Sequence, residues 1–103
     1  MEIFVTGGAG FIGTNLCKKL ALLHKVTVYD NFSNSSQENF PDIKNVKLIA
    51  GDFLNKSLLH DSMKNHDIVI HLAAKIDVID SINNPNNTFQ TNVQGTQNVL
   101  DSC

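Results

Sequence analysis

Short apolar runs alternate along the chain with stretches whose apolar residues recur at helical spacing. Four runs rich in β-branched residues predict strands at residues 2–6, 26–29, 46–50 and 67–72. Three stretches with a helical period predict helices at residues 11–23, 55–66 and 85–102. The last predicted strand is apolar without alternation, which is typical of a strand buried on both faces. This order of elements predicts an α/β fold with a parallel sheet.

Loop and capping residues refine the elements. Asn-rich segments at 31–45 and 81–87 predict loops. Asn55 or Ser57 can cap the second helix, and Pro85 suits the first turn of the third. The inner side of that last helix should carry five residues at helical spacing, namely Phe89, Val93, Thr96, Val99 and Leu100. Right-handed crossovers then give a Rossmann-type open sheet with helices on both faces and strand order 3-2-1-4.

The length fits one domain, residues 1–103, with a single core. The pattern ends after the helix that would lead to a fifth strand. We therefore expect the amino-terminal part of a larger fold, truncated before strand five and lacking a substrate domain. A chain with 42% apolar and 17% charged residues has the composition of an ordinary globular protein.

Charge and cysteine content narrow the possible partners. The net charge of −2 is spread without blocks, so nothing indicates binding to nucleic acid or to an anionic membrane. No apolar run approaches the length of a membrane span, and the amino-terminal residues do not look like a leader, so we expect a cytoplasmic protein. Cys17 and Cys103 indicate neither a metal site nor a disulfide framework, and Cys17 should be a buried apolar residue.

A glycine-rich turn joins the first predicted strand to the first predicted helix. Gly7, Gly10 and Gly13 follow the spacing of dinucleotide-binding turns. Such glycines allow a tight turn, let the backbone approach a pyrophosphate, and let helix and sheet pack closely. The N–H groups of Gly10, Phe11 and Ile12 should point outward at the positive end of the helix dipole. The turn predicts a site for NAD or a close relative.

Asp30 closes the second predicted strand, about 20 residues beyond the glycine turn, where a carboxylate can accept from the adenosine ribose hydroxyls. It would repel a 2′-phosphate, and all eight basic residues are lysines, so no guanidinium offsets that repulsion. These residues favour NAD over NADP. The alternative is that Asp30 only caps the loop that follows it.

Five motifs together resemble the extended short-chain dehydrogenase/reductase family, above all its NAD-dependent nucleotide-sugar epimerases and dehydratases of the UDP-glucose 4-epimerase type. They lie at residues 6–13, 29–31, 51–52, 71–74 and 92–96. The likeness covers essentially the whole chain in order. It implies NAD as cofactor, a nucleotide sugar as substrate of the full-length protein, and a possible homodimer.

The resemblance also implies a role for individual residues. It puts Asp30 on the adenosine ribose with Asn31 and Asn34 nearby, and Asp52 with Phe53 on the adenine ring. Leu72, Ala73 and Ala74 would line the pyrophosphate and the nicotinamide ribose. Asn92 would support the cofactor site from the last helix, or else be a core polar group bonded to backbone. We expect His71 to be a core histidine with its hydrogen bonds satisfied.

No catalytic residue can be named in this sequence. The chemistry of the family depends on a Tyr-x-x-x-Lys pair, but the one tyrosine, Tyr29, is followed four residues later by Ser33. The sequence therefore predicts the NAD-binding part of a nucleotide-sugar epimerase or dehydratase that transiently oxidises a sugar hydroxyl, itself without activity. The alternative is a stand-alone, non-catalytic dinucleotide-binding module or sensor.

Overall fold

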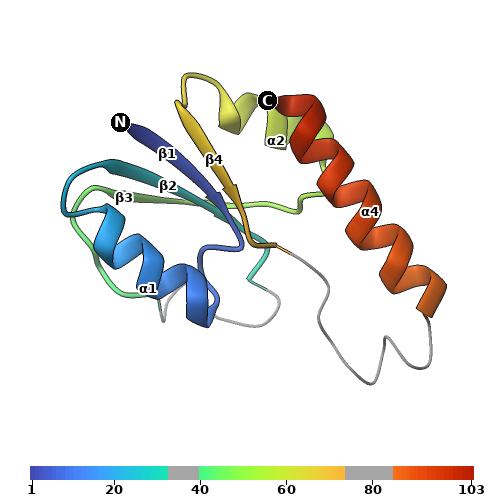
Figure 1. Cartoon of the computed structure of the whole chain (residues 1–103), viewed down its shortest axis with the longest axis horizontal. Coiled ribbons are helices and arrows are strands. Elements are labelled where there is room, and N and C mark those ends of the chain that lie inside the picture. The colour runs from blue at the N-terminus through green and yellow to red at the C-terminus, as the bar shows by residue number, and fades with distance from the viewer. Residues whose placement is uncertain (33–39, 74–84) are drawn as a thin grey trace.

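A four-stranded parallel sheet forms the centre of the molecule (Figure 1). The computed structural model describes residues 1–32, 40–73 and 85–103. The strands are β1 (Glu2–Thr6), β2 (Lys25–Asp30), β3 (Val46–Ala50) and β4 (Ile68–His71). Their order is β3-β2-β1-β4, and every neighbouring pair is parallel. The predicted fold class and strand order are confirmed.

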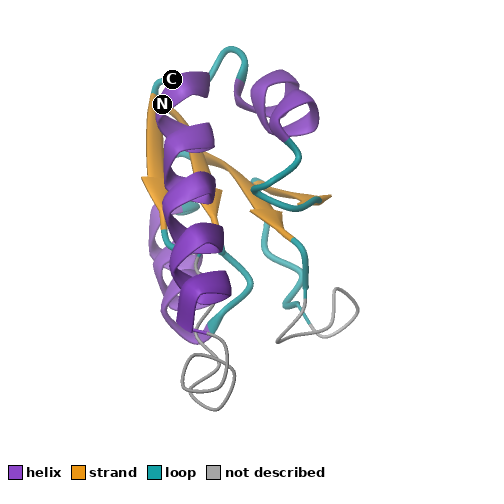
Figure 2. Cartoon of the chain, turned by 90° about the vertical axis from the view of Figure 1, so that its right-hand side faces the viewer, coloured by secondary structure: helices purple, strands orange, loops and turns teal. Residues whose placement is uncertain are grey.

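Helices cover both faces of the sheet. The helices are α1 (Phe11–Leu20), α2 (Lys56–Met63) and α4 (Pro85–Ser102). Against α1 lies one buried cluster, formed by Ile3, Val5, Cys17, Ala21, Val26 and Val28. Against α2 and α4 lies the other, formed by Phe4, Tyr29, Leu59, Met63 and Val99. Neighbouring residues of β1 thus enter opposite layers. Figure 2 shows α4 upright beside the strands, with α2 next to its C-terminal end.

Two helices end earlier than the sequence predicts. Helix α1 stops at Leu20, not residue 23, because the chain must turn back for Lys25 to pair with Glu2. Leu22 and Leu23 of that turn are exposed. Helix α2 stops at Met63, not residue 66, since Lys64 is extended. Its predicted cap is confirmed, because the Asn55 side chain accepts from the Leu58 N–H at 3.3 Å.

The predicted inner side of the last helix is largely wrong, although its bounds are right. Val99 is buried, but Val93 and Leu100 are 52% and 64% exposed and Thr96 is exposed as well. The side chain of Phe89 lies outside the described part. The helix presents Gly95, Asn98 and Val99 to the molecule, because the ring of Phe53 packs directly on Gly95. Thr96, though exposed, still reaches β4 through its hydroxyl, which lies 3.2 Å from His71 Nε2.

Buried Cys17 agrees with its predicted role. Its side chain is fully enclosed between α1 and the sheet, and burial raises the pKa of its thiol to about 11. Within the described residues, no helix is both long enough and apolar enough to cross a membrane.

Candidate functional site

The carboxyl ends of the four parallel strands bring several loops to one edge of the sheet (Figure 1). These loops, with the end of β2 and the first turn of α1, carry most of the residues predicted to bind a cofactor: Gly7, Gly10, Phe11, Ile12, Gly13, Asp30, Asn31, Asp52, Phe53, Leu72 and Ala73. Asn92 lies on α4, while Asn34 and Ala74 lie outside the described residues. Carboxyl edges of this kind are where ligands of open α/β sheets bind.

The glycine turn after β1 contains two glycines that the packing of the chain requires, Gly7 and Gly13. It also contains one, Gly10, that the packing does not require. Gly7 has φ +71° and donates its N–H to the Tyr29 carbonyl at 2.9 Å. A Cβ on Gly13 would lie 2.6 Å from the Gly7 oxygen. Among the described residues, a Cβ on Gly10 would meet only that oxygen, at 3.6 Å, which is an ordinary contact. The described part of the chain therefore leaves the space beside Gly10 open.

The start of α1 suits an anion. Gly10 is its N-cap, with extended backbone and no side chain that could cap the helix. The first N–H groups of the helix can therefore donate to an acceptor on a ligand. Phe11 and Ile12 are 86% and 70% exposed beside it. Two large apolar side chains on the rim of a polar turn fit a ligand that has both a charged and a flat apolar part.

Asp30 joins the end of β2 to the glycine turn. One carboxylate oxygen accepts from the Ala9 N–H at 3.1 Å, and the other accepts from the Phe32 N–H at 2.7 Å. The bond to Phe32 is the loop-capping contact that sequence reasoning raised as an alternative. The bond to Ala9 goes further, because it sets the carboxylate beside the glycine turn. Each oxygen keeps a second lone pair for a further donor.

The turn after β3 holds Asp52 and Phe53 against β2. The Tyr29 hydroxyl donates to the Asp52 carbonyl at 2.7 Å, and an Asp52 carboxylate oxygen accepts from the Leu54 N–H at 2.9 Å. Gly51 is needed here, since a Cβ would lie 2.6 Å from the Tyr29 ring. Burial and then the Asp52 charge raise the pKa of Tyr29. Tyr29 is thus a neutral structural donor, as its place in the strand predicts.

Helix α4 supports the same turn from behind. Asn98 is only 3% exposed and donates to the carbonyls of Phe53 at 3.2 Å and Leu54 at 3.5 Å. Gly95 makes room for the Phe53 ring, because a Cβ would lie 2.3 Å from it. Sequence reasoning missed both residues. It chose Asn92 as the supporting asparagine, and that role of the half-buried Asn92 stays a prediction.

His71 connects β4 to its neighbours on either side. Its Nδ1 lies 2.6 Å from the Thr6 hydroxyl, and its Nε2 lies 3.2 Å from the Thr96 hydroxyl. The predicted satisfied hydrogen bonds are confirmed, but His71 is half-buried and not in the core. Thr6, which is fully buried, was not singled out by the sequence. In the described ranges, no group of three or more His, Cys, Asp or Glu side chains could hold a metal ion.

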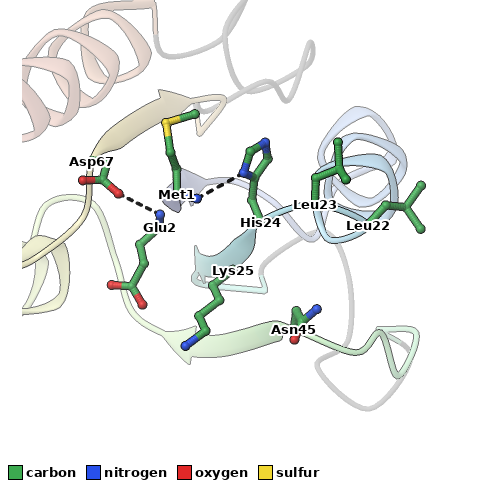
Figure 3. Close-up of a pocket in the computed structure, with 8 residues that line it drawn as sticks. All are labelled: Met1, Glu2, Leu22, Leu23, His24, Lys25, Asn45 and Asp67. Atoms are coloured by element: carbon green, nitrogen blue, oxygen red, sulfur yellow. Dashed lines mark hydrogen bonds between the residues drawn. The ribbon is translucent and has the colours of Figure 1, made fainter.

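A hollow of about 480 Å³ lies at the opposite, amino end of the strands (Figure 3). There the terminal ammonium of Met1 donates to His24 Nδ1 at 3.2 Å, and the Glu2 N–H donates to the Asp67 carboxylate at 2.9 Å. Its walls hold charges of both signs and two exposed leucines. None of the predicted cofactor residues lines it.

Comparisons with known proteins agree with this geometry. Residues 3–103 match the model of the NAD-dependent epimerase/dehydratase family. The chain is 35% identical over 96% of its length to a UDP-N-acetyl-alpha-D-glucosaminuronate decarboxylase of Bacillus cytotoxicus, of which it covers 32%. It is 35% identical over 99% of its length to a dTDP-glucose 4,6-dehydratase of Mycobacterium tuberculosis, of which it again covers 32%.

A solved structure gives the same result. The UDP-glucose 4-epimerase from Brucella ovis in complex with NAD superposes with a TM-score of 0.85 and is 36% identical, covering 99% of this chain and 31% of that one. The chain thus spans about a third of the length of these relatives. The family model and these relatives confirm the predicted resemblance, and NAD is the cofactor of the family. The chain therefore belongs to the NAD-dependent epimerase/dehydratase family.

Proposed function

We propose that the carboxyl edge of the sheet binds NAD. The N–H groups of Gly10, Phe11 and Ile12 receive the pyrophosphate at the start of α1, where no side chain caps the helix. The Gly10 N–H donates to the Gly7 carbonyl at a long 3.3 Å, so it would share its proton with the ligand. Asp30 accepts from the adenosine ribose hydroxyls, with Asn31 and Asn34 beside it. Its position against the Ala9 N–H supports this, because that bond keeps the carboxylate next to the turn.

The two later turns complete the proposed site. Asp52 receives the exocyclic amine of adenine and Phe53 flanks the ring, on a turn that Tyr29 and Asn98 hold in place. Leu72, Ala73 and Ala74 line the pyrophosphate and the nicotinamide ribose. Asn92 supports the site from α4. Gly7 and Gly13 bind no ligand group through a side chain, but they keep the turn in shape.

For the whole protein we propose nucleotide-sugar chemistry, in which this chain is the NAD-binding part of an epimerase or dehydratase. Held at this edge, NAD would supply a hydride acceptor for the transient oxidation of a sugar alcohol, while the hydroxyl proton would pass to the tyrosine base that the family uses. The described residues bind and orient the cofactor. The tyrosine and lysine pair of this family has no counterpart among these 103 residues, so we expect the chain alone to be inactive.

The open space beside Gly10 is the observation that carries the proposal. Gly7 and Gly13 are glycines because the chain itself fills the space around them, whereas a Cβ on Gly10 would have an ordinary contact with the protein. Packing within the chain does not require a glycine at this position. A glycine here, at a helix start that no side chain caps, allows a ligand to approach the backbone closely. A pyrophosphate is the group that such a turn is suited to receive.

Calorimetric titration of the 103-residue chain with NAD tests this proposal. Gly10→Ala should raise the NAD Kd about tenfold or more, since it displaces charge-assisted hydrogen bonds worth about 1.5–3 kcal/mol each. Its free energy of unfolding should change by less than about 1 kcal/mol, because φ is −73° and the new Cβ has room. Gly13→Ala, by contrast, should lower both stability and affinity.

Lys19→Ala, at the far end of α1, is the matched control and should change neither property. An unchanged NAD Kd in Gly10→Ala would contradict the pyrophosphate role. A loss of stability in Gly10→Ala would instead show that the turn needs this glycine for its own packing, and the binding result would then lose its meaning.

A further inference from the structure

A chain of hydrogen bonds through His71 crosses three elements behind the proposed cofactor site. The Thr6 hydroxyl of β1 lies 2.6 Å from Nδ1, and the Thr96 hydroxyl of α4 lies 3.2 Å from Nε2. The Thr6 hydroxyl also accepts from the N–H groups of Leu72 at 3.2 Å and Ala73 at 3.3 Å. The His71 side chain therefore links β1 to α4. Through Thr6 it is also connected to the turn that follows β4.

The direction of these bonds fixes the state of the imidazole. Backbone N–H groups can only donate, so the Thr6 oxygen is their acceptor, and its own proton needs an acceptor elsewhere. Thr6 is 0% exposed, and among its described contacts the acceptor is His71 Nδ1. Nδ1 therefore carries no proton, and the neutral ring donates from Nε2 to Thr96.

The turn at Leu72 and Ala73, which bonds to Thr6, packs directly against the glycine turn. The backbone of Ala73 lies so close to Gly7 that a Cβ on Gly7 would come within 2.7 Å of the Ala73 nitrogen. Leu72 has a second acceptor, since its N–H also bonds the Thr6 carbonyl at 2.9 Å. The position of Ala73 consequently depends on the orientation of one hydroxyl.

We propose that His71 is a positioning residue for the cofactor site, acting through Thr6 on the turn at Leu72 and Ala73, and that only its neutral Nε2–H form does so. This inference rests on the proposed function, because it concerns the same NAD site. It adds a residue that touches no cofactor and a dependence on protonation.

Protonation of His71 would break this arrangement. A proton on Nδ1 would have to donate to the Thr6 oxygen, in competition with Ala73, and the buried Thr6 proton would lose its acceptor. The groups facing the ring are Thr6 from β1, Thr96 from α4 and the ring of Phe53, whose centroid is 6.0 Å away. The charged residues on those elements are Glu2 of β1, Asp101 of α4 and Asp52, which precedes Phe53. Burial lowers the pKa of His71.

Nuclear magnetic resonance of the 103-residue chain tests the tautomer without any cofactor. The ¹⁵N shifts of His71 should identify a proton on Nε2 at pH 7.5, and its pKa should lie below 6.5. As His71 becomes protonated, the protection factor of the Ala73 amide, which is its exchange rate relative to the intrinsic rate at each pH, should fall at least several-fold. A proton on Nδ1 at pH 7.5, or an Ala73 amide indifferent to the titration, would overturn the inference.

NAD binding between pH 5 and 7.5 tests the consequence. Because the free chain must lose a proton to bind, the NAD Kd should rise up to about tenfold per pH unit below the pKa of His71. His71→Asn keeps an acceptor near Nδ1 but cannot titrate, so its profile should be flat and its affinity at pH 7.5 within about threefold of the wild type. His60→Asn, exposed on α2, should keep the wild-type profile.

The two arms separate this inference from the proposed function. A pH dependence that persists in His71→Asn would overturn the role of His71 while leaving NAD binding intact. Failure to bind NAD at any pH would overturn the proposed function and the cofactor part of this inference, and the resonance data would still decide whether His71 positions the turn.

Discussion

Asp30 is the residue at which the adenosine side and the pyrophosphate side of the proposed site meet. Its two carboxylate oxygens already bond backbone on either side, to Ala9 and to Phe32. A carboxylate held by two N–H groups is fixed in direction, so little side-chain entropy remains to be lost when ribose hydroxyls arrive. In the proposed site, the same fixed negative charge would face the position where NADP carries its extra phosphate.

Replacing Asp30 should therefore change cofactor choice. In Asp30→Ala the NAD Kd should rise about tenfold or more, since charged hydrogen bonds contribute about 1.5–3 kcal/mol. Binding of NADP should weaken less, because the repulsion is lost together with the bonds, so the ratio of the two Kd values should move toward one. Calorimetry with both cofactors measures this ratio.

The control is Asp61→Asn, which removes an exposed negative charge on α2 and should leave the ratio unchanged. Equal wild-type affinities for NAD and NADP would contradict the ribose role of Asp30. An unchanged ratio in Asp30→Ala would contradict it as well.

Helix α4 acts as a support at the scale of whole elements. It reaches the turn after β3 through Asn98 and Gly95, and it reaches β4 through Thr96 and His71. The Lys56–Asp101 ion pair, at 3.2 Å, joins its C-terminal end to α2 but is exposed and contributes little. Besides the apolar contact of Val99 with the core, α4 thus makes polar and close-packed contacts at the site itself.

Asn98→Ala should lower the free energy of unfolding by about 1–3 kcal/mol, because it leaves the buried Phe53 carbonyl without its donor. The turn carrying Asp52 should loosen, so NAD affinity should fall as well. Urea unfolding and calorimetry measure the two effects. Gln97→Ala, on the exposed side of the same helix, should change stability by less than about 0.5 kcal/mol. Wild-type stability in Asn98→Ala would contradict the supporting role.

Local patterns predicted the elements better than they predicted the contacts between them. The four strands and the glycine turn follow from runs and spacings that are complete within a few residues. Asn98 and Thr6 could not be found in this way, because they bond residues far away in the sequence. Asn98 bonds Phe53, 45 residues away, and Thr6 bonds Ala73, 67 residues away. The inner side of α4 was mispredicted for the same reason, since Gly95 is inward only because Phe53 packs on it.

At the scale of the whole molecule, the two outermost strands of the sheet, β3 and β4, differ. Edge strand β3 carries Lys47, an exposed charge of the kind that discourages strands from pairing between molecules. Edge strand β4 reads Ile-Val-Ile-His, and Ile68 is 39% exposed, with Leu72 beyond it at 38%. Val93 and Leu100 on α4 add further exposed apolar surface to the chain.

Among the described residues, no strand pairs with the outer side of β4, so we expect the chain to associate with itself. An outermost strand beside exposed apolar side chains favours strand pairing between copies. Sedimentation velocity should therefore show an average mass that rises with concentration, and Ile68→Lys should weaken that rise by placing a charge on the edge. Leu22→Lys is the matched control, because it makes the same substitution at an 80% exposed position away from β4. If Leu22→Lys abolishes association and Ile68→Lys does not, the contact lies at the turn after α1 and the edge strand is not its cause.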